Sequence, residues 1–348
     1  MLKFLSFVRI WIMNAAPDES LVVRKHKERH VVNPEVGHPR LCWGKLFEPE
    51  IEVRRYRNVV VVLEGSKKYI FNKDDYFKGE EVKVDDVKNI RGLTLNMVEP
   101  GGSLFSHWLF DCVSKIPLVR DAGFNIKDFK NIILNVANRP YHNETLNKLG
   151  VDDGVVVERN KEGTVYLVED LIDITPSRYK MVTPCWQVEY IRSLFHDKGA
   201  SDCHTLPSKK VFINREKGRR ALIDDNKGLE TLKDRGFEIL NLDKITVSAA
   251  ASIFNSADFV LGPHGAGFSN IVFSKPKTKV LESFSRHVSS EFFLLSQEIG
   301  VEHEFAEEPD EKGKRWFEYD LDYSKNFVDI NSAKVKLTET TLSHDFAR

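Results

Sequence analysis

A turn that places a histidine among glycines is the first feature of this sequence that could do chemistry. The segment GPHGAG, residues 262–267, follows an apolar run at 259–261. Glycines let a backbone approach a ligand closely, and a helix starting here would offer free N–H groups and the positive end of its dipole. His264 can add a donor, and Ser269 and Asn270 can hydrogen-bond locally. The turn suits a phosphate or diphosphate, and the alternative is a plain tight turn with a satisfied histidine.

A basic cluster follows another predicted strand. The strand at 209–214 is succeeded by REKGRR, which contains Arg215, Lys217, Arg219 and Arg220. Arginine binds phosphate through two parallel donors and stays charged at any relevant pH. In an open parallel sheet the ligand sits beyond the carboxyl ends of the strands, so we expect the cluster and the GPHGAG turn to share one anion-binding edge. A solvated charged loop is the alternative.

A polar stripe runs along a predicted buried helix at residues 103–116. Ser103, His107, Asp111 and Ser114 lie between two apolar rows of this helix. Because so apolar a helix must be buried, its stripe faces either a hydrogen-bonded core or a cleft. His107 and Asp111 can touch, and a carboxylate paired with an imidazole can remove a proton from a hydroxyl. A purely structural His–Asp bond is the alternative.

Two enzyme classes use similar glycine turns. GAGFSN approximates the start of a dinucleotide fingerprint, and Glu282 lies 15 positions beyond Gly267, near where a ribose-binding acid is expected. The third glycine is Asn270 here, and Lys275-Pro276 ends the helix early, which disfavours a nicotinamide enzyme. An esterase oxyanion loop needs a GxSxG nucleophile elbow, and the sequence has none.

The second half of the chain alternates strands and helices regularly. Strands are predicted at 209–214, 237–242, 258–262, 279–284 and 301–305, and helices at 224–236, 247–257 and 289–300. Thr246 would cap the middle helix, and Gly236 and Gly300 would end the other two. This alternation predicts βαβ units and a Rossmann-like parallel sheet.

The first half is less regular. It predicts a hairpin at 58–71 that turns at Gly65-Ser66, strands at 92–98, 131–136 and 154–158, and helices at 103–116 and 141–149. That is a second α/β domain with antiparallel additions. We expect residues 1–205 to form this N-terminal domain, 206–305 the Rossmann-like domain, and 306–348 a segment that packs across both.

Charge and composition exclude several classes of protein. The chain has 348 residues, of which 41% are hydrophobic and 30% charged, as in soluble two-domain proteins. A net charge of −1 gives no global field for nucleic acid, so no nucleic-acid partner is expected. The four cysteines are scattered, and the one metal candidate, the DLD at 320–322, has no strand before it. We therefore expect no metal.

The N-terminal segment bears on location. Its apolar stretch is too short to span a membrane, and Lys3 and Arg9 interrupt it, which argues against a signal peptide. We expect a cytoplasmic protein whose first residues are buried. The alternative is a peripheral membrane contact, with Phe4 and Trp11 among the side chains in the interface.

Together these pieces resemble glycosyltransferase family 61, the DUF563 group, which includes protein O-GlcNAc and O-mannose N-acetylglucosaminyltransferases and plant xylan xylosyl- and arabinosyltransferases. The similarity is carried by SLFSHWLFDCVSKIPLV, by INREKGRRALIDDN and by IFNSADFVLGPHGAGFSNIVFSKPKTKVLESF, over most of residues 100–285. The chain departs from the family where ALIDDN replaces a more usual ILNE.

The resemblance implies a GT-B-like fold, with two facing Rossmann-like domains and a cleft between them. It implies a nucleotide-sugar donor, usually a UDP-sugar, a glycan acceptor, and no cofactor. The donor would be held by Arg215, Lys217, Arg219, Arg220, His264, Gly265, Ala266, Gly267 and Asn270, with Glu282 on the ribose hydroxyls. We expect inversion, with Asp111 as the general base and His107 either orienting it or contacting the sugar. A non-catalytic nucleotide-sugar-binding protein and an NAD-dependent oxidoreductase are the alternatives.

Overall fold

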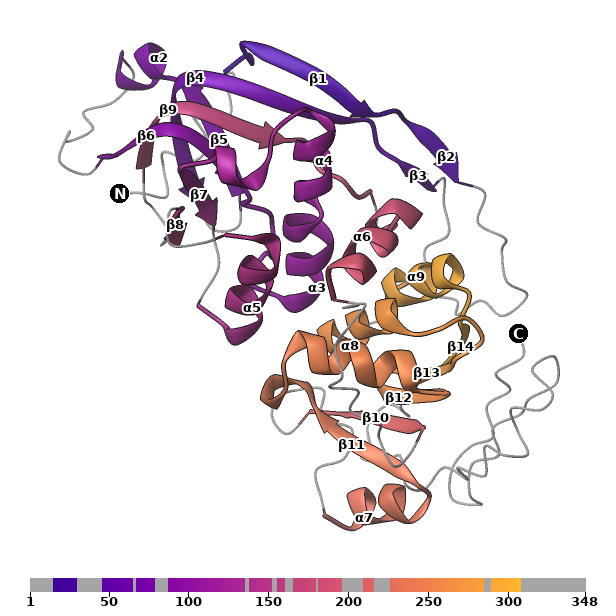
Figure 1. Ribbon diagram of the computed structural model, residues 1–348. Helices are drawn as coiled ribbons and strands as arrows, with labels where there is room; N and C mark the ends of the chain where they lie inside the picture. Colours follow the sequence, from indigo (N-terminus) through magenta and orange to yellow (C-terminus); the bar gives the residue numbers. More distant parts are fainter. Residues whose placement is uncertain are drawn as a thin grey trace. The chain divides into compact units, whose positions relative to one another are not determined.

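The computed structural model describes most of the chain, and Figure 1 shows its helices and strands. The described residues are 15–29, 46–64, 67–78, 87–134, 138–151, 155–159, 165–179, 181–195, 209–215, 226–284 and 289–307. The chain divides into two compact units, the first made of Met1–Lys27 and Glu48–Tyr179 and the second of Glu28–Phe47 and Lys180–Arg348. The predicted boundary at residue 205 and the Gly65-Ser66 turn lie outside the described residues. Each unit contains helices and strands, so the predicted α/β class is confirmed.

The first unit is built on one mixed sheet. Its strands are β1 (Glu19–Arg24), β4 (Ile51–Glu64), β5 (Lys67–Asn72), β6 (Val87–Asn96), β7 (Asn131–Leu134), β8 (Val156–Arg159) and β9 (Val165–Ile174). Their order is β1-β4-β9-β6-β7-β8, and β5 also pairs with β4. β6 is parallel to β7 and β9, and β7 to β8, whereas β4 is antiparallel to β1, β5 and β9. The predicted hairpin of β4 and β5 and the antiparallel additions are therefore confirmed.

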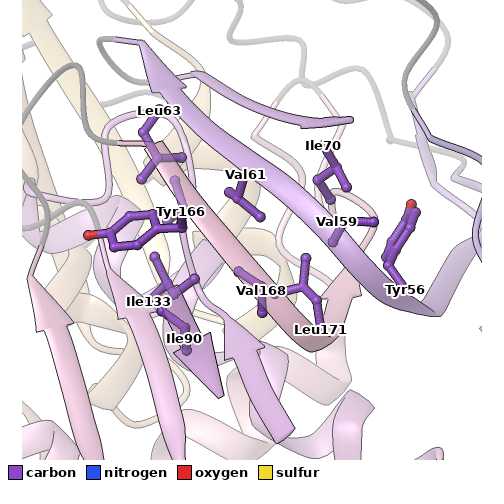
Figure 2. Close-up of a cluster of buried hydrophobic side chains, with 11 residues drawn as sticks. Tyr56, Val59, Val61, Leu63, Ile70, Ile90, Ile133, Tyr166, Val168 and Leu171 are labelled. Atoms are coloured by element: carbon purple, nitrogen blue, oxygen red, sulfur yellow. The ribbon is translucent and has the colours of Figure 1, made fainter. Parts of the chain in front are cut away.

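The second half of β4, residues 59–63, is a continuous apolar run because both of its faces are buried there. Residues of β4 pack into a cluster with side chains from β5, β6, β7 and β9 (Figure 2): Tyr56, Val59, Val61, Leu63, Ile70, Ile90, Ile133, Tyr166, Val168 and Leu171. Val98, in the segment after β6, belongs to the same cluster. Val60 and Val62 point to the other face, where they pack with Phe71 and Tyr76. Each fully buried valine stabilises the fold by about 1.5–3 kcal/mol. Burial on both faces removes the period-two alternation that marks a half-buried strand.

β9 is a strand that the sequence pattern did not identify. Glu169 and Asp170 interrupt its apolar residues in the middle. Asp170 accepts two hydrogen bonds from Arg55 on β4, at 2.9 and 2.7 Å, and Glu169 accepts one from the backbone N–H of Gly92 at 2.7 Å. These partners come from distant parts of the chain, so the pairing that makes the charges acceptable is invisible in the local sequence.

The helices of the first unit include the one that carries the predicted polar stripe. They are α2 (Lys73–Lys78), α3 (Phe105–His107), the π-helix η3 (Trp108–Val113), α4 (Lys115–Asp121), the 3-10 helix η4 (Ile126–Asp128) and α5 (Pro140–Leu149). The single helix predicted at 103–116 is thus three consecutive segments. Pro117 has no N–H for the carbonyl four residues earlier, and the hydroxyl of Ser114 donates to the carbonyl of Leu109, five residues earlier, at 3.1 Å.

The second unit has a five-stranded, all-parallel sheet, as predicted. Its strands are β10 (Lys210–Asn214), β11 (Phe237–Asn241), β12 (Phe259–Pro263), β13 (Lys279–Phe284) and β14 (Glu302–Glu307), in the order β11-β10-β12-β13-β14. Its helices are α6 (Cys185–Phe195), α7 (Asn226–Asp234), η5 (Leu242–Lys244), α8 (Val247–Ser256), η6 (Ala266–Phe273) and α9 (Glu291–Ile299).

The strand order reverses between β10 and β12. Ligands of open α/β sheets bind at such a reversal, outside the carboxyl ends of the strands. Two short strands, β2 (Lys27–Arg29) and β3 (Leu46–Glu48), pair with each other.

The predicted cap of α8 is present and can be tested. The side chain of Thr246 accepts a hydrogen bond from the backbone N–H of Ala249 at 3.1 Å. Thr246→Ala removes this bond and should lower the free energy of unfolding by about 1 kcal/mol. Thr246→Ser keeps the hydroxyl and is the matched control. Urea unfolding of both variants measures the difference, and equal losses would show that the cap contributes nothing.

Candidate functional site

The GPHGAG turn lies where the strand order reverses. β12 ends at Pro263, Gly265 has φ 143° and ψ −174°, and the 3-10 helix η6 begins at Ala266. This backbone conformation is open almost only to glycine. The predicted helix after the turn is therefore present, but it is a 3-10 helix whose last six residues, 268–273, are buried. The side chain of Asn270 stays local, because its Nδ2 donates to the carbonyl of Gly267 at 2.9 Å.

An added Cβ would meet different neighbours at each of the three glycines of this turn. A Cβ on Gly262 would lie 2.8 Å from Ile213 Cβ, and one on Gly267 would lie 3.1 Å from both Ile213 Cγ2 and Leu242 Cδ1. These two glycines let the turn pack against β10 and the residue that follows β11. A Cβ on Gly265 would instead lie 3.0 Å from Arg215 Nη1. Gly265 is therefore the glycine that leaves room for a charged group.

Arg215 and the GPHGAG turn come together at the same edge of the sheet. Arg215 directly follows β10, and its guanidinium lies against Gly265 beyond β12. A guanidinium beside a glycine backbone at a strand-order reversal has the charge and the place that suit an anion, so the predicted anion-binding edge stays a prediction that this geometry favours. The rest of the predicted basic cluster, Lys217, Arg219 and Arg220, lies outside the described residues.

Glu282 lies behind the turn, in the core. It is fully buried on β13, and its Oε1 is 2.5 Å from Nδ1 of His264 while its Oε2 is 3.2 Å from Nε2 of His303. Burial raises the pKa of Glu282, but the two histidines lower it by more, so that the net shift is downward. Ribose binding by Glu282 stays a prediction. The contacts that the structure gives its carboxylate are with the two histidines.

A second cluster lies in the first unit and is built around Asp111. His107 comes from α3 and Asp111 from the π-helix η3, and their Nδ1 and Oδ2 atoms are 2.7 Å apart. Arg178, which follows β9, donates from Nε to Oδ1 at 2.6 Å and from Nη2 to Oδ2 at 2.8 Å. The guanidinium is 2% exposed and lies 5.1 Å from the ring centre of Phe110. The predicted contact of His107 and Asp111 is present, and it is part of a triad.

Arg178 makes Asp111 a poor proton acceptor. Burial raises the pKa of Asp111, but the charge and hydrogen bonds of Arg178 and the hydrogen bond of His107 lower it to about 2. Both carboxylate oxygens are already hydrogen-bonded. These contacts suit Asp111 to orienting the imidazole, as a carboxylate does in a Ser-His-Asp triad. The ring of His107 packs on Gly101, with Nε2 directed away from Asp111 because Nδ1 faces it.

Sequence reasoning missed Arg178 because no local signal marks it. It stands alone in the segment SRY, 67 residues after its partner Asp111. The sequence indicated only that a buried carboxylate such as Asp111 needs a compensating cation, and it did not indicate which one. The π-helix contributes as well, because its wider turn changes which side chains of 108–113 share a face.

A buried charge cluster attaches this helix to the sheet. Lys115 on α4 lies 2.6 Å from Glu99, which follows β6, and donates to the carbonyl of Val98 at 3.3 Å. Lys68 on β5 lies 2.6 Å from Asp173 on β9 and 3.3 Å from Glu99. Two cations and two anions balance one another, so the cluster is neutral as a whole. It fixes the loop between β6 and α3, and thereby the place of His107.

Gly101 in that loop offers a test of how tightly His107 is held. Gly101 has φ +74°, and a Cβ there would lie 2.7 Å from Cδ2 of His107. Gly123, with φ +91° and no atom within 4 Å of an added Cβ, is the matched control. Alanine at either position costs about 1–2 kcal/mol for its backbone conformation. Gly101→Ala should cost about 1–3 kcal/mol more, because it also displaces the imidazole. Chemical unfolding measures both, and equal losses would show that the ring moves aside freely.

Among the residues that the structure describes, no three histidine, cysteine, aspartate or glutamate side chains are grouped to hold a metal ion. No described helix has both the length and the apolar character needed to cross a bilayer. The DLD at 320–322, the tail from residue 308 and the N-terminal residues 1–14 lie outside the described part of the chain.

Comparison with known proteins identifies the family. The model of the family Glycosyltransferase 61 matches residues 105–281, which is just over half of the chain. The match begins at the helix that carries His107 and ends one residue before Glu282. A search of curated proteins found no significant match. The family match includes His107, Asp111, Arg178, Arg215 and the GPHGAG turn, and on this evidence the chain belongs to glycosyltransferase family 61.

Proposed function

We propose that this protein transfers a sugar from a UDP-sugar to a hydroxyl of a glycan, with inversion at the anomeric carbon and without a metal. Membership of a glycosyltransferase family supports glycosyl transfer. The observation that carries the proposal is the guanidinium of Arg215 lying against Gly265 at the strand-order reversal of a parallel sheet. In this proposal the two units form a GT-B-like pair with the donor and acceptor sites facing one cleft.

The donor half of the site would stabilise the departing diphosphate. As the bond from the anomeric carbon to the diphosphate oxygen breaks, both of its electrons go to that oxygen. Arg215, the backbone N–H groups at the start of η6 and His264 would meet the developing negative charge. Fixed donors of this kind need no reorganisation during the reaction, and losing one typically costs about 100- to 1,000-fold in rate. Lys217, Arg219 and Arg220 would extend the same cluster.

The acceptor half would remove a proton from the attacking hydroxyl. We assign this step to Nε2 of His107, with Asp111 and Arg178 orienting the ring, which reverses the roles that the sequence suggested. The hydroxyl oxygen forms its bond to the anomeric carbon as its proton passes to Nε2. Because the oxygen attacks opposite the leaving diphosphate, the configuration inverts. UDP is the second product, and the imidazolium returns its proton to solvent.

Ligand-dependent unfolding separates this function from its two alternatives. A ligand that binds the folded state at about 100 times its Kd stabilises it by about 2.7 kcal/mol. We expect UDP to raise the midpoint of thermal unfolding and NAD to leave it unchanged. Protection by NAD alone would favour an oxidoreductase.

A panel of UDP-sugars then tests catalysis. Release of UDP from one of them, in the presence or absence of glycan acceptors, is the expected result. UDP protection with no turnover of any UDP-sugar would instead favour a nucleotide-sugar-binding protein that does not catalyse transfer. The configuration of the product at the anomeric carbon, read by proton NMR, tests inversion.

A further inference from the structure

Behind the GPHGAG turn, four side chains form a continuous polar chain in the core. His264 Nδ1 is 2.5 Å from Glu282 Oε1, and Glu282 Oε2 is 3.2 Å from His303 Nε2. His303 Nδ1 is 2.6 Å from the hydroxyl oxygen of Ser296, and that oxygen is 2.7 Å from the carbonyl of Phe292. The chain thus runs from the end of β12 through β13 and β14 to α9.

The short contacts along this chain of side chains favour one distribution of protons. The hydroxyl of Ser296 has one hydrogen, which it donates to the carbonyl of Phe292 within its own helix. The contact between Ser296 and His303 therefore needs a hydrogen on Nδ1 of His303. Nε2 of His303 and Oε2 of Glu282 are both buried and hydrogen-bond to no described group, although they face each other at 3.2 Å. A hydrogen on Nε2 would make this contact an ion pair, because together with the hydrogen on Nδ1 it makes His303 an imidazolium.

Charge balance points the same way. His264 is 6% exposed, Glu282 0% and His303 2%. The ring of His264 lies 5.1 Å from that of Phe284 and 5.4 Å from that of Phe292. An isolated carboxylate in such apolar surroundings would cost several kcal/mol. A cationic His303, an anionic Glu282 and a neutral His264 sum to zero.

Among the residues that the structure describes, the other charged groups near these side chains do not supply this compensation. Glu304 on β14 is an anion, and its pKa is raised by burial although His303 and Lys279 act to lower it. Arg215 lies on the other side of the turn, against Gly265. His303 is therefore the cation that directly faces the second oxygen of Glu282.

We propose that His303 is a buried imidazolium and that His303, Glu282 and Ser296 are positioning residues for His264. Their chain directs Nδ1–H of His264 at Glu282, so that Nε2 is the ring nitrogen that could reach a bound donor. This inference rests on the proposed function for the role of His264 but not for the charge of His303. Glu282 and His303 both lie beyond the residues matched by the family, 105–281.

Nitrogen-15 NMR of the histidine side chains tests the charge directly. The wild-type chain is labelled and its imidazoles are assigned through backbone connectivity, with His303→Gln as a second route. At pH 7.5 we expect His303 to have a proton on both nitrogens and His264 to have one on Nδ1. His142 is the internal control, because its Nδ1 accepts a hydrogen bond from the backbone N–H of Arg139 at 3.2 Å. It should show the opposite neutral tautomer, and a neutral His303 would overturn the proposal.

Variants test the positioning role. Glu282→Gln and His303→Gln each leave the other group uncompensated, so both should unfold at lower temperature and bind UDP more weakly, by about 10- to 100-fold, as when the partner of a metal-binding histidine is removed. The double variant Glu282→Gln/His303→Gln is neutral and should regain much of the stability. We expect it not to regain the affinity for UDP.

The outcomes separate this inference from the proposed function. Recovery of both stability and affinity in the double variant would show that the chain is only structural. If wild-type protein did not bind UDP, the proposed function would fail, while the NMR result would still decide whether His303 is charged.

Discussion

Replacing His107 with glutamine is expected to lower the rate of sugar transfer by about 100- to 10,000-fold, the usual contribution of a general base. Glutamine keeps a polar side chain of similar length but cannot accept a proton at neutral pH. The affinity for UDP should stay close to that of the wild type, because in our proposal the nucleotide is held by the second unit. Turnover of the preferred UDP-sugar and calorimetric titration with UDP measure the two quantities.

The pH dependence of kcat distinguishes His107 from Asp111 as the base. A general base must be deprotonated, so the rate falls as the pH drops through the pKa of that group. Since the pKa of Asp111 is about 2, a reaction that used it would keep its rate far into acid. Imidazole groups ordinarily titrate near neutral pH, so a decline there indicates a histidine. A rate that holds down to the acid limit of folding would return the role to Asp111.

Asp111→Asn and Arg178→Lys complete this comparison. Asparagine can no longer hold the imidazole in one tautomer, and lysine cannot make the two parallel bonds that Arg178 makes to Asp111. Both should reduce kcat, and the decline near neutral pH should remain in whatever activity is left. Unchanged turnover in either variant would remove that residue from the triad.

The second unit was the more predictable half of the molecule for a physical reason. Its parallel strands are short, the central strands β12 and β13 are almost wholly buried, and its helices carry their own end signals, such as Thr246 and Gly300. Those signals are local, and local interactions can be read from consecutive residues. From these local signals all five strands were predicted, as was the approach of Arg215 to the GPHGAG turn, and the structure shows both.

What the sequence did not reveal depends on contacts between distant segments. Arg178 reaches Asp111 over 67 positions, and Glu282 reaches His303 across two neighbouring strands. The π-helix was missed because a π-turn leaves the apolar periodicity of 103–116 nearly intact, so the consecutive residues do not distinguish it from an α-helix. The sequence motifs thus predicted the His107–Asp111 pair and an anion-binding edge at the GPHGAG turn. The partners that affect the protonation of these groups, Arg178 and His303, were recognised only in the structure.

Arg215→Gln is expected to have the second large effect, a loss of about 100- to 1,000-fold in kcat/KM together with weaker binding of UDP. Glutamine removes the charge that would face the departing diphosphate and retains only one amide. Arg215→Lys keeps the charge but not the planar fork, so it should recover part of the affinity for UDP and little of the rate. Steady-state kinetics and calorimetry with UDP measure both. A wild-type affinity in Arg215→Gln would place the diphosphate elsewhere.

Gly265→Ala tests whether that charge acts from the place where the structure holds it. The added Cβ would lie 3.0 Å from Nη1 of Arg215, so the guanidinium must shift, and the backbone at φ 143° adds strain of about 1–3 kcal/mol. Gly236→Ala, with φ +79° and nothing within 4 Å of the new atom, controls for strain in the same unit. If Gly265 matters through Arg215, Gly265→Ala should weaken UDP binding in the wild type but not further in Arg215→Gln. Additive losses in the double variant would mean that the turn contacts the donor by itself, through its backbone, and that Arg215 contributes separately.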